Sequence, residues 1–191
     1  MSSSDRAVFL DRDGVINEKA PEGSYITNLS QFKILPGALD AIARLNQNRF
    51  RTFLITNQRG IARGLVSPEN IAVMHEYLRD AVRRASGCIE KIYLCPHDYA
   101  DDCDCRKPRP GMLRAAALEF GLDLKQSWMI GDSAIDVEAG RRAGCRTAYI
   151  GDDACPQADL NGPTLKSVVA LLLALEPRHP QVAPPVRHHD P

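Results

Sequence analysis

The chain has 191 residues, of which 44% are hydrophobic and 25% charged, and its formal net charge is zero. This length fits one domain with a buried core, and the neutral balance gives no reason to expect a nucleic acid or an anionic membrane as partner. No apolar run approaches the roughly 20 residues of a membrane-spanning helix, and the first residues do not resemble a signal peptide. We therefore expect a cytoplasmic protein whose six cysteines are thiols or metal ligands rather than disulfides.

Short apolar segments alternate with segments of helical periodicity along the chain. The first strand is predicted at 7–10, followed by a helix over 37–46. A strand at 52–55 precedes a helix with Ser67 as N-cap and Pro68 as its first residue. Further strands are predicted at 91–94, 128–130 and 147–150, and further helices at 112–120, 136–143 and 165–175. This alternation predicts an α/β fold in which helices cover both faces of a central parallel sheet.

The domain organisation is simple, because no repeat or interdomain linker interrupts this pattern. We expect one domain over residues 1–175. Residues 176–191 contain five prolines and three histidines with almost no large apolar side chains. We therefore expect a disordered tail there.

Polar side chains follow the predicted strands at the ends where parallel sheets bind ligands. They are Asp11, Asp13, Thr56, Lys107, Asp132 and Asp136. Each of these signals alone is also typical of a turn or a helix cap, but their recurrence at successive strand ends favours a site. Acidic groups gathered at one edge repel one another unless a cation lies among them, and carboxylate oxygens suit Mg²⁺. We expect an anionic substrate group to bridge this metal and the lysine.

In order and spacing, these residues resemble the four signature motifs of the haloacid dehalogenase-like (HAD) superfamily of phosphatases. The motifs are Asp11-x-Asp13-x-Val15, Thr56, Lys107 and Gly131-Asp132-x3-Asp136. The resemblance extends over roughly residues 7–150. It implies a Rossmann-like HAD fold and a phosphoric monoester hydrolase.

The resemblance also implies how the acids act. Asp11 would attack phosphorus and form an aspartyl phosphate. Asp13 would protonate the leaving group and then activate the water that cleaves the intermediate. Mg²⁺ would be held by the Asp11 carboxylate, the Asp13 main-chain carbonyl and Asp132. An aspartate at position 13 favours hydrolysis over accumulation of the acyl phosphate.

The remaining motif residues would support this chemistry. Thr56 and Lys107 would neutralise the transferring oxygens, because electrostatics and positioning dominate phosphoryl transfer. Asp136 lies one helical turn beyond Asp132, so we expect it to orient the site rather than bind the metal.

A cysteine–histidine cluster precedes Lys107. Cys95-Pro96-His97 and Cys103-Asp104-Cys105 form the pattern C-x-H-x5-C-x-C. Four such ligands can close a tetrahedral Cys3His site, for which zinc is the natural occupant, and the site would be structural because protein fills every position. Bound Zn²⁺ would fix a segment of low apolar content and place Arg106 beside the phosphates. Free thiols are the alternative, and we expect them at Cys88, Cys145 and Cys155.

The spacing of the motifs limits the substrate. About 40 residues separate the first motif from Thr56 and about 50 separate Thr56 from Lys107, which leaves no room for a cap domain. We expect an open site shaped by loops 17–35 and 95–110. Two HAD subgroups combine a capless fold with a zinc loop. One dephosphorylates heptose 1,7-bisphosphate for lipopolysaccharide core synthesis, and the other histidinol phosphate.

The segment 56–64 favours the heptose subgroup. It reads TNQRGIARG, where TNQSGIARG is usual in that subgroup, so Arg59 departs from the pattern. The segment 105–112 also fits. We therefore expect removal of the 7-phosphate from a heptose bisphosphate, with histidinol phosphate as the alternative substrate. A non-catalytic, zinc-stabilised binding protein is the alternative from another class.

Substrate contacts can be assigned by charge and position. A bisphosphate needs a second cationic contact, for which Arg106 is the first candidate and Arg59 and Arg63 are reserves; a solvated surface is the alternative for each. Gly23 and Tyr25, in a loop longer than the subgroup suggests, are candidates for sugar contacts. Four further candidates adjoin the motifs: Arg12, Asn57, Gln58 and Ser133. We expect a monomer whose partner is a small phosphorylated sugar.

Overall fold

The structure is a computed structural model that describes residues 5–176. Its six strands form one sheet in the order β3-β2-β1-β4-β5-β6, and all neighbouring strands are parallel. The strands are β1 (Ala7–Leu10), β2 (Arg51–Asn57), β3 (Lys91–Cys95), β4 (Trp128–Gly131), β5 (Arg146–Ile150) and β6 (Leu160–Gly162). The chain changes direction across the sheet between β3 and β4. This places the end of β1 at the switch point, where open α/β sheets bind ligands.

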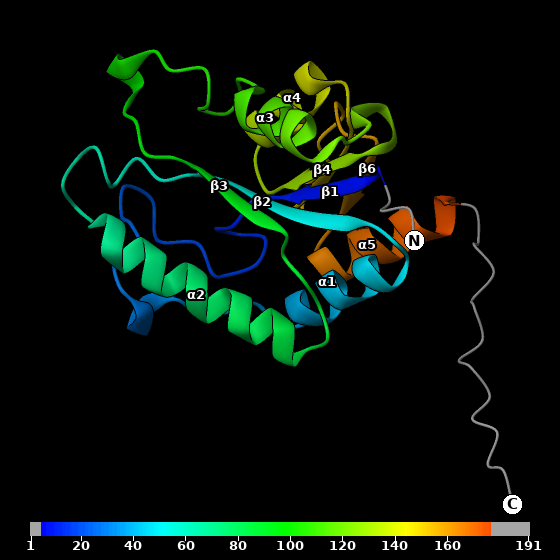
Figure 1. Cartoon of the computed structure of the whole chain (residues 1–191), viewed down its shortest axis with the longest axis horizontal. Coiled ribbons are helices and arrows are strands. Elements are labelled where there is room, and N and C mark those ends of the chain that lie inside the picture. Colours follow the sequence, from blue (N-terminus) through cyan, green and yellow to red (C-terminus); the bar gives the residue numbers. More distant parts are fainter. Residues whose placement is uncertain (1–4, 177–191) are drawn as a thin grey trace, which may run out of the picture.

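Helices cover both faces of the sheet (Figure 1). They are α1 (Ala38–Gln47), α2 (Pro68–Arg84), α3 (Gly111–Phe120), α4 (Ala134–Ala143) and α5 (Leu165–Leu175), with short 3-10 turns η1 (Leu29–Gln31), η2 (Tyr99–Asp101) and η3 (Leu124–Gln126). Helices α3 and α4 lie on one face, and α1, α2 and α5 on the other (Figure 1). The predicted α/β fold is therefore confirmed.

The central strand β1 shows why the sheet is buried on both sides. Successive side chains of a strand point to opposite faces. Val8 and Leu10 pack into the core under α1, α2 and α5, whereas Ala7 and Phe9 pack into the core under α3 and α4. All four side chains are completely buried, as expected of a strand in a parallel sheet.

Local signals place the helix ends close to the predicted positions. Ser67 caps α2, since its Oγ accepts a hydrogen bond from the Asn70 backbone N–H at 3.1 Å. Gly121 ends α3 with φ at 64°, a conformation that favours glycine. Strand β6 was not predicted, because its three residues carry no apolar run and its pairing with β5 is a long-range feature.

Glu176, the first residue of the expected tail, contacts the edge of the sheet. Its carboxylate accepts hydrogen bonds from Arg6 Nη1 at 2.9 Å, Arg146 Nη1 at 3.0 Å and Trp128 Nε1 at 3.4 Å. These donors precede β1 or begin β4 and β5, so Glu176 joins the end of α5 to the amino-terminal edge of the sheet. The rest of the predicted tail, 177–191, lies outside the described residues.

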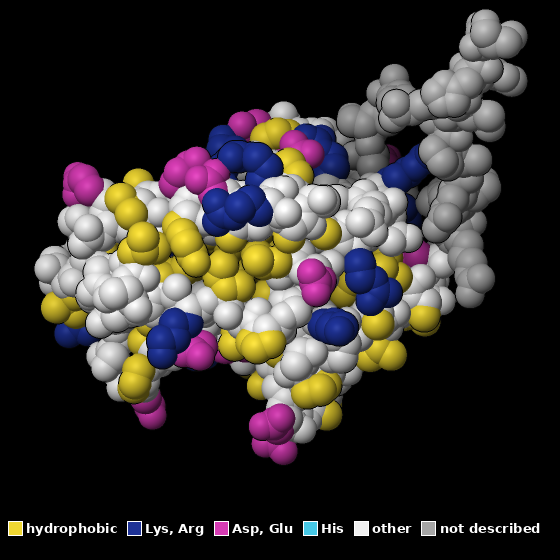
Figure 2. Space-filling model, turned by 90° about the horizontal axis from the view of Figure 1, so that it is seen from below, with side chains coloured by type: hydrophobic (Ala, Val, Ile, Leu, Met, Phe, Trp, Pro, Cys, Tyr) yellow, Lys and Arg dark blue, Asp and Glu magenta, His cyan; other side chains and the backbone are white. Residues whose placement is uncertain are grey.

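The face formed by α1, α2 and α5 carries mixed charge. Lys and Arg side chains are interspersed with Asp and Glu, and apolar side chains lie between them (Figure 2). None of the helices in the described part of the chain is long and apolar enough to cross a bilayer.

Candidate active site

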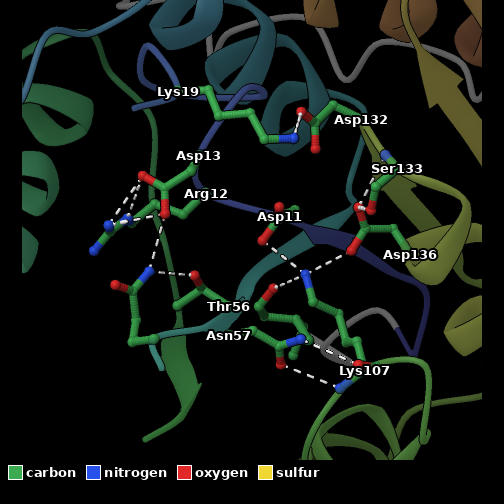
Figure 3. A network of polar contacts seen from close by, with 12 residues as sticks. Asp11, Arg12, Asp13, Lys19, Thr56, Asn57, Lys107, Asp132, Ser133 and Asp136 are labelled. Atoms are coloured by element: carbon green, nitrogen blue, oxygen red, sulfur yellow. Dashed lines mark hydrogen bonds and ion pairs between the residues drawn. The ribbon is translucent and has the colours of Figure 1, made fainter. Parts of the chain in front are cut away.

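Side chains from several loops and strand ends meet above the carboxyl end of β1 (Figure 3). They surround a cavity of about 350 Å³. Its lining includes the motif residues Asp11, Asp13, Thr56, Lys107, Asp132 and Asp136. The sequence motifs, which are far apart along the chain, are thus brought to one place by the parallel strands.

Two glycines allow the chain to approach these acids closely. Gly14 has φ at 87°, and a Cβ added there would lie 2.1 Å from Asp132 Oδ2. A Cβ on Gly131 would lie 2.2 Å from Asp136 Cβ. The Asp11 backbone N–H donates to Ile130 O at 2.9 Å, which extends the pairing of β1 with β4. The site therefore depends on close packing of the loops after β1 and β4.

Lys107 lies at the centre of the acids. Its Nζ is 2.7 Å from Asp11 Oδ1, 2.6 Å from Asp136 Oδ1 and 2.9 Å from Ile55 O. Burial alone would lower the pKa of Lys107, but the two carboxylates hold it above its usual value. The lysine is therefore charged throughout the neutral range.

Asn57 fixes the loop that carries this lysine. Its Nδ2 donates to Lys107 O and its Oδ1 accepts from the Lys107 backbone N–H, both at 3.1 Å. Asn57 and Thr56 are the last residues of β2 rather than residues beyond it. Asn57, which we expected at the substrate, lines the cavity, and its side chain contacts the backbone of Lys107.

The carboxylates of Asp11, Asp132 and Asp136 outnumber the lysines that contact them. Carboxylate oxygens of Asp11, Asp132 and Asp136 all lie within 4.8 Å of one another. Besides Lys107, Lys19 lies near them: its Nζ is 2.7 Å from Asp132 Oδ2 and its side chain is 59% exposed. Burial raises the pKa of Asp11 to about 7, although Lys107 counteracts it. The carboxylates of Asp11 and Asp132, hard oxygen donors with surplus negative charge around them, fit a divalent cation such as Mg²⁺, while Asp136 contacts Lys107.

Asp13 has different surroundings from Asp11. Its carboxylate accepts hydrogen bonds from Arg12 Nη2 at 2.9 Å, Asn17 Nδ2 at 2.8 Å and Gln58 Nε2 at 3.0 Å. Burial would raise the pKa of Asp13, but the Arg12 guanidinium and these amides hold it below its ordinary value. The two aspartates of the first motif are therefore held in different electrostatic environments.

Gln58 and Ser133 connect motif residues to each other. The Gln58 Nε2 that contacts Asp13 also donates to Thr56 Oγ1 at 2.8 Å. Ser133 caps α4, and its Oγ donates to Asp136 Oδ2 at 2.5 Å. The same Asp136 carboxylate accepts from the Ser133 backbone N–H at 3.2 Å. Asp136 is thereby oriented with its other oxygen toward Lys107.

Arg12 is fully buried beneath Asp13. One of its nitrogens, Nη1, lies 3.3 Å from His75 Nε2, and its guanidinium lies 5.5 Å from the ring centre of Phe32. Arg12, which we expected to contact the substrate, is part of the cavity lining, and its charge pairs with Asp13. Because arginine only donates, His75 Nε2 accepts, and the imidazole is neutral.

His75 should make stability depend on pH. Burial, together with the Arg12 charge, lowers its pKa to about 4 from an ordinary 6.5. The unfolded chain therefore binds more protons between these values, so stability is complete above pH 6.5 and falls as the pH drops toward 4. The free energy of unfolding should fall by at most about 3.4 kcal/mol through this group. Urea unfolding of wild type and His75→Gln between pH 4 and 7 measures it.

The comparison with His75→Gln isolates this contribution, since glutamine keeps an acceptor for Arg12 but does not titrate. The variant should lose less stability than wild type on acidification. Equal losses in the two proteins would show that His75 does not titrate as described.

The cysteine–histidine cluster is assembled as its spacing predicts. Cys103 Sγ lies 3.5 Å from Cys95 Sγ and 3.4 Å from Cys105 Sγ, and His97 Nδ1 lies 3.2 Å from Cys105 Sγ. All four potential ligand atoms lie within 4.8 Å of one another. Zn–S bonds of about 2.3 Å place ligands about 3.7 Å apart in a tetrahedron. The cluster therefore has the composition and approximate size of a zinc site.

A second cavity, of about 230 Å³, adjoins the first. The predicted candidates Gly23, Tyr25, Arg59 and Arg106 line it, together with Ser24, Asn57 and Tyr99. Arg63 is exposed, and its Nη1 lies 3.4 Å from Tyr25 Oη. The loops 17–35 and 95–110 thus flank the site, as expected.

Four residues of this region were not singled out from the sequence: Asn17, Lys19, His75 and Tyr99. A signal exists for Asn17, which ends the same DRDGVIN segment that contains Asp11 and Asp13. His75 lies within α2 and 63 residues from Arg12, so its sequence position carries no comparable signal.

Comparisons with known proteins agree with this geometry. Residues 104–173 match the HAD-hydrolase-like family model. The D-glycero-beta-D-manno-heptose-1,7-bisphosphate 7-phosphatase of Pseudomonas aeruginosa is 42% identical over 143 residues, which cover 75% of this chain and 79% of the relative. The enzyme of the same name from Bordetella bronchiseptica is 39% identical over 73% of this chain and 77% of its own.

A solved structure is also similar. The crystal structure of D,D-heptose 1,7-bisphosphate phosphatase from Bordetella bronchiseptica, complexed with magnesium and phosphate, superimposes with a TM-score of 0.82 at 33% identity. The superposition covers 88% of this chain and 98% of the other. The likeness therefore spans most of the fold.

Proposed function

Because the chain belongs to the HAD-like family of D-glycero-beta-D-manno-heptose-1,7-bisphosphate 7-phosphatases, we propose that it hydrolyses the 7-phosphate of D-glycero-D-manno-heptose 1,7-bisphosphate. It is a phosphoric monoester hydrolase. The observation that carries the proposal is the meeting of Asp11, Lys107 and Asp132 around one cavity. Nucleophile, cation and metal-binding acid are all parts that phosphoryl transfer requires.

Asp11 is the proposed nucleophile. A carboxylate oxygen forms a bond to phosphorus as the bond between phosphorus and the sugar oxygen breaks, which gives an acyl phosphate and an alkoxide. Lys107, held 2.7 Å from Asp11 Oδ1, neutralises charge on the transferring oxygens, and Thr56 contributes its hydroxyl. The carboxylate must be ionised to attack, and the charge of Lys107 favours that form.

Asp13 is the proposed acid and base. A phosphate dianion that enters the site raises the pKa of the neighbouring Asp13 carboxyl, so that it can carry the proton given to the leaving alkoxide. The ionised Asp13 then takes a proton from the water that attacks phosphorus, which releases phosphate and regenerates the Asp11 carboxylate. Its three donors keep it ionised between turnovers.

Two metals complete the proposal. Mg²⁺ would be held by the Asp11 and Asp132 carboxylates and the Asp13 main-chain carbonyl, where it would offset negative charge on the phosphoryl group. Support comes from the crowding of acids in this chain and from the magnesium in the Bordetella enzyme. Zn²⁺ would be held by Cys95, His97, Cys103 and Cys105 as a structural ion.

The remaining assignments follow from the substrate. Arg106 would bind the 1-phosphate that is not transferred, and Gly23 and Tyr25 would contact the sugar. A soluble sugar phosphate of lipopolysaccharide core synthesis suits a cytoplasmic monomer with a single domain over residues 1–175. Neither a nucleic acid nor a membrane is needed as partner.

Parallel assays of heptose 1,7-bisphosphate and histidinol phosphate test this function. We expect Mg²⁺-dependent phosphate release, with a much larger kcat/KM for the heptose; EDTA should stop it and added Mg²⁺ restore it. A larger kcat/KM for histidinol phosphate would contradict the proposed substrate, and no release from either would favour a binding protein.

A further inference from the structure

Two arginines from different segments lie together beside the active site. Arg59 follows β2, and Arg106 follows the cysteine–histidine cluster. Their guanidinium carbons lie 4.6 Å and 4.4 Å from the ring centre of Tyr99. Both line the cavity of about 230 Å³. Gly23, Ser24, Tyr25 and Asn57 line this cavity as well as the larger one that contains Asp11, so the two cavities adjoin along the same loop.

This pair of guanidinium groups is poorly neutralised. Within residues 5–176, Asp98 is the acid in ion-pair range of either arginine; its Oδ1 is 3.7 Å from Arg59 Nη1, and its side chain is 37% exposed. Such an exposed pair is weak and screened by salt. Arg106 donates from Nη1 to His97 O at 3.0 Å, while its buried Nε has no hydrogen-bond partner in the described part of the chain. Charge and donors therefore remain for an anion.

Arg59 also contacts the loop that lines both cavities. Its Nε donates to Tyr25 Oη at 3.0 Å. This bond uses only Nε, so the two terminal nitrogens of the guanidinium remain, one of them near Asp98. If Arg59 served only to hold this loop, the hydrogen bond to Tyr25 would be sufficient. The surplus positive charge and the shared cavity indicate a second role toward a ligand.

We propose that Arg59 is a specificity-determining residue that, with Arg106, binds the phosphate that stays on the sugar. Two guanidinium groups can grip one phosphate through several charge-assisted hydrogen bonds, which a single arginine cannot match. The chain would therefore select a bisphosphate over a monophosphate more strongly than a phosphatase with serine at this position. This inference rests on the proposed function, because it concerns the same substrate.

The test compares Arg59→Ser with the matched control Arg83→Ser. Arg83 lies on α2, its side chain is 70% exposed, and it lines neither cavity. The substrates are heptose 1,7-bisphosphate and heptose 7-phosphate, which lacks the retained phosphate. Arg59→Ser should lower kcat/KM for the bisphosphate about 10- to 100-fold, mainly through KM, and change that for the monophosphate less than about two-fold. Arg83→Ser should change neither by more than about two-fold.

A second measurement uses the product heptose 1-phosphate, which carries only the retained phosphate. As an inhibitor it should bind about 10-fold or more weakly to Arg59→Ser than to wild type. Arg59→Lys, which keeps the charge but loses the planar fork, should fall between them. If Arg59→Ser does not fold, the lysine variant supplies the same comparison.

The outcomes separate the inference from the proposed function. An equal loss for both substrates in Arg59→Ser, matched by Tyr25→Phe, would mean that Arg59 acts only through the loop and would overturn the inference. Unchanged inhibition by heptose 1-phosphate would do the same. If wild type hydrolyses neither heptose phosphate, the proposed function itself is wrong, whatever Arg59 does.

Discussion

Replacing Asp11 by asparagine is expected to abolish turnover, with a loss of at least about 10⁴-fold in kcat. An amide cannot form the aspartyl phosphate, and Asp11 is the residue that directly follows β1. The fold should persist, because Asn is nearly isosteric and Lys107 keeps its contact with Asp136 Oδ1 at 2.6 Å. Single-turnover and steady-state phosphate release with heptose bisphosphate measure the loss.

The stability of this variant gives a second test. Burial, together with the nearby Asp136 and Asp13 carboxylates, already raises the pKa of Asp11 to about 7, which means that its ionised form is held at some cost. Removing the charge should leave the thermal midpoint unchanged or higher. Asp80→Asn, an exposed substitution on α2, is the matched control and should keep full activity. Substantial turnover by Asp11→Asn would remove the nucleophile assignment.

Replacing Cys105 by serine is expected to release zinc and loosen the loop that carries Arg106. Structural zinc sites contribute on the order of 10 kcal/mol of apparent binding energy, and the cluster joins β3 to this loop. We expect zinc to fall from about one ion per chain to almost none, and the thermal midpoint to fall by about 10 °C or more. The kcat/KM for the bisphosphate should fall more than about 100-fold.

Metal analysis and thermal unfolding of wild type, Cys105→Ser and Cys88→Ser measure these effects. Cys88 is an exposed free thiol outside the cluster, so its replacement should change neither zinc content nor midpoint. Full zinc content in Cys105→Ser, or none in wild type, would contradict a Cys3His site.

The sequence best predicted the features that are determined by neighbouring residues. The strand before Asp11, the cap at Ser67 and the cysteine–histidine spacing each depend on residues close together in the chain, and each was predicted. The meeting of Asp11, Lys107 and Asp132 could also be predicted, because parallel strands bring their carboxyl ends to one edge.

Long-range partners were not predictable in the same way. His75 meets Arg12 across 63 positions and Glu176 meets Arg6 across 170, and nothing in the local pattern selects either pair. The buried position of Arg12 likewise depends on the packing of α2 against the loop after β1. Sequence position alone therefore gave no indication that the charge of Arg12 pairs with Asp13.

The Glu176 contacts have a consequence for which substitutions this protein can tolerate. They tie down the starts of β1, β4 and β5, whereas the acids lie at the opposite ends of β1 and β4. The contacts that stabilise the sheet thus lie at the amino-terminal ends of the strands, and the reactive groups lie at the carboxyl ends. Substitutions near the acids can change the substrate specificity of the enzyme without lowering its stability. Substitutions that remove the Glu176 contacts should first lower the thermal midpoint.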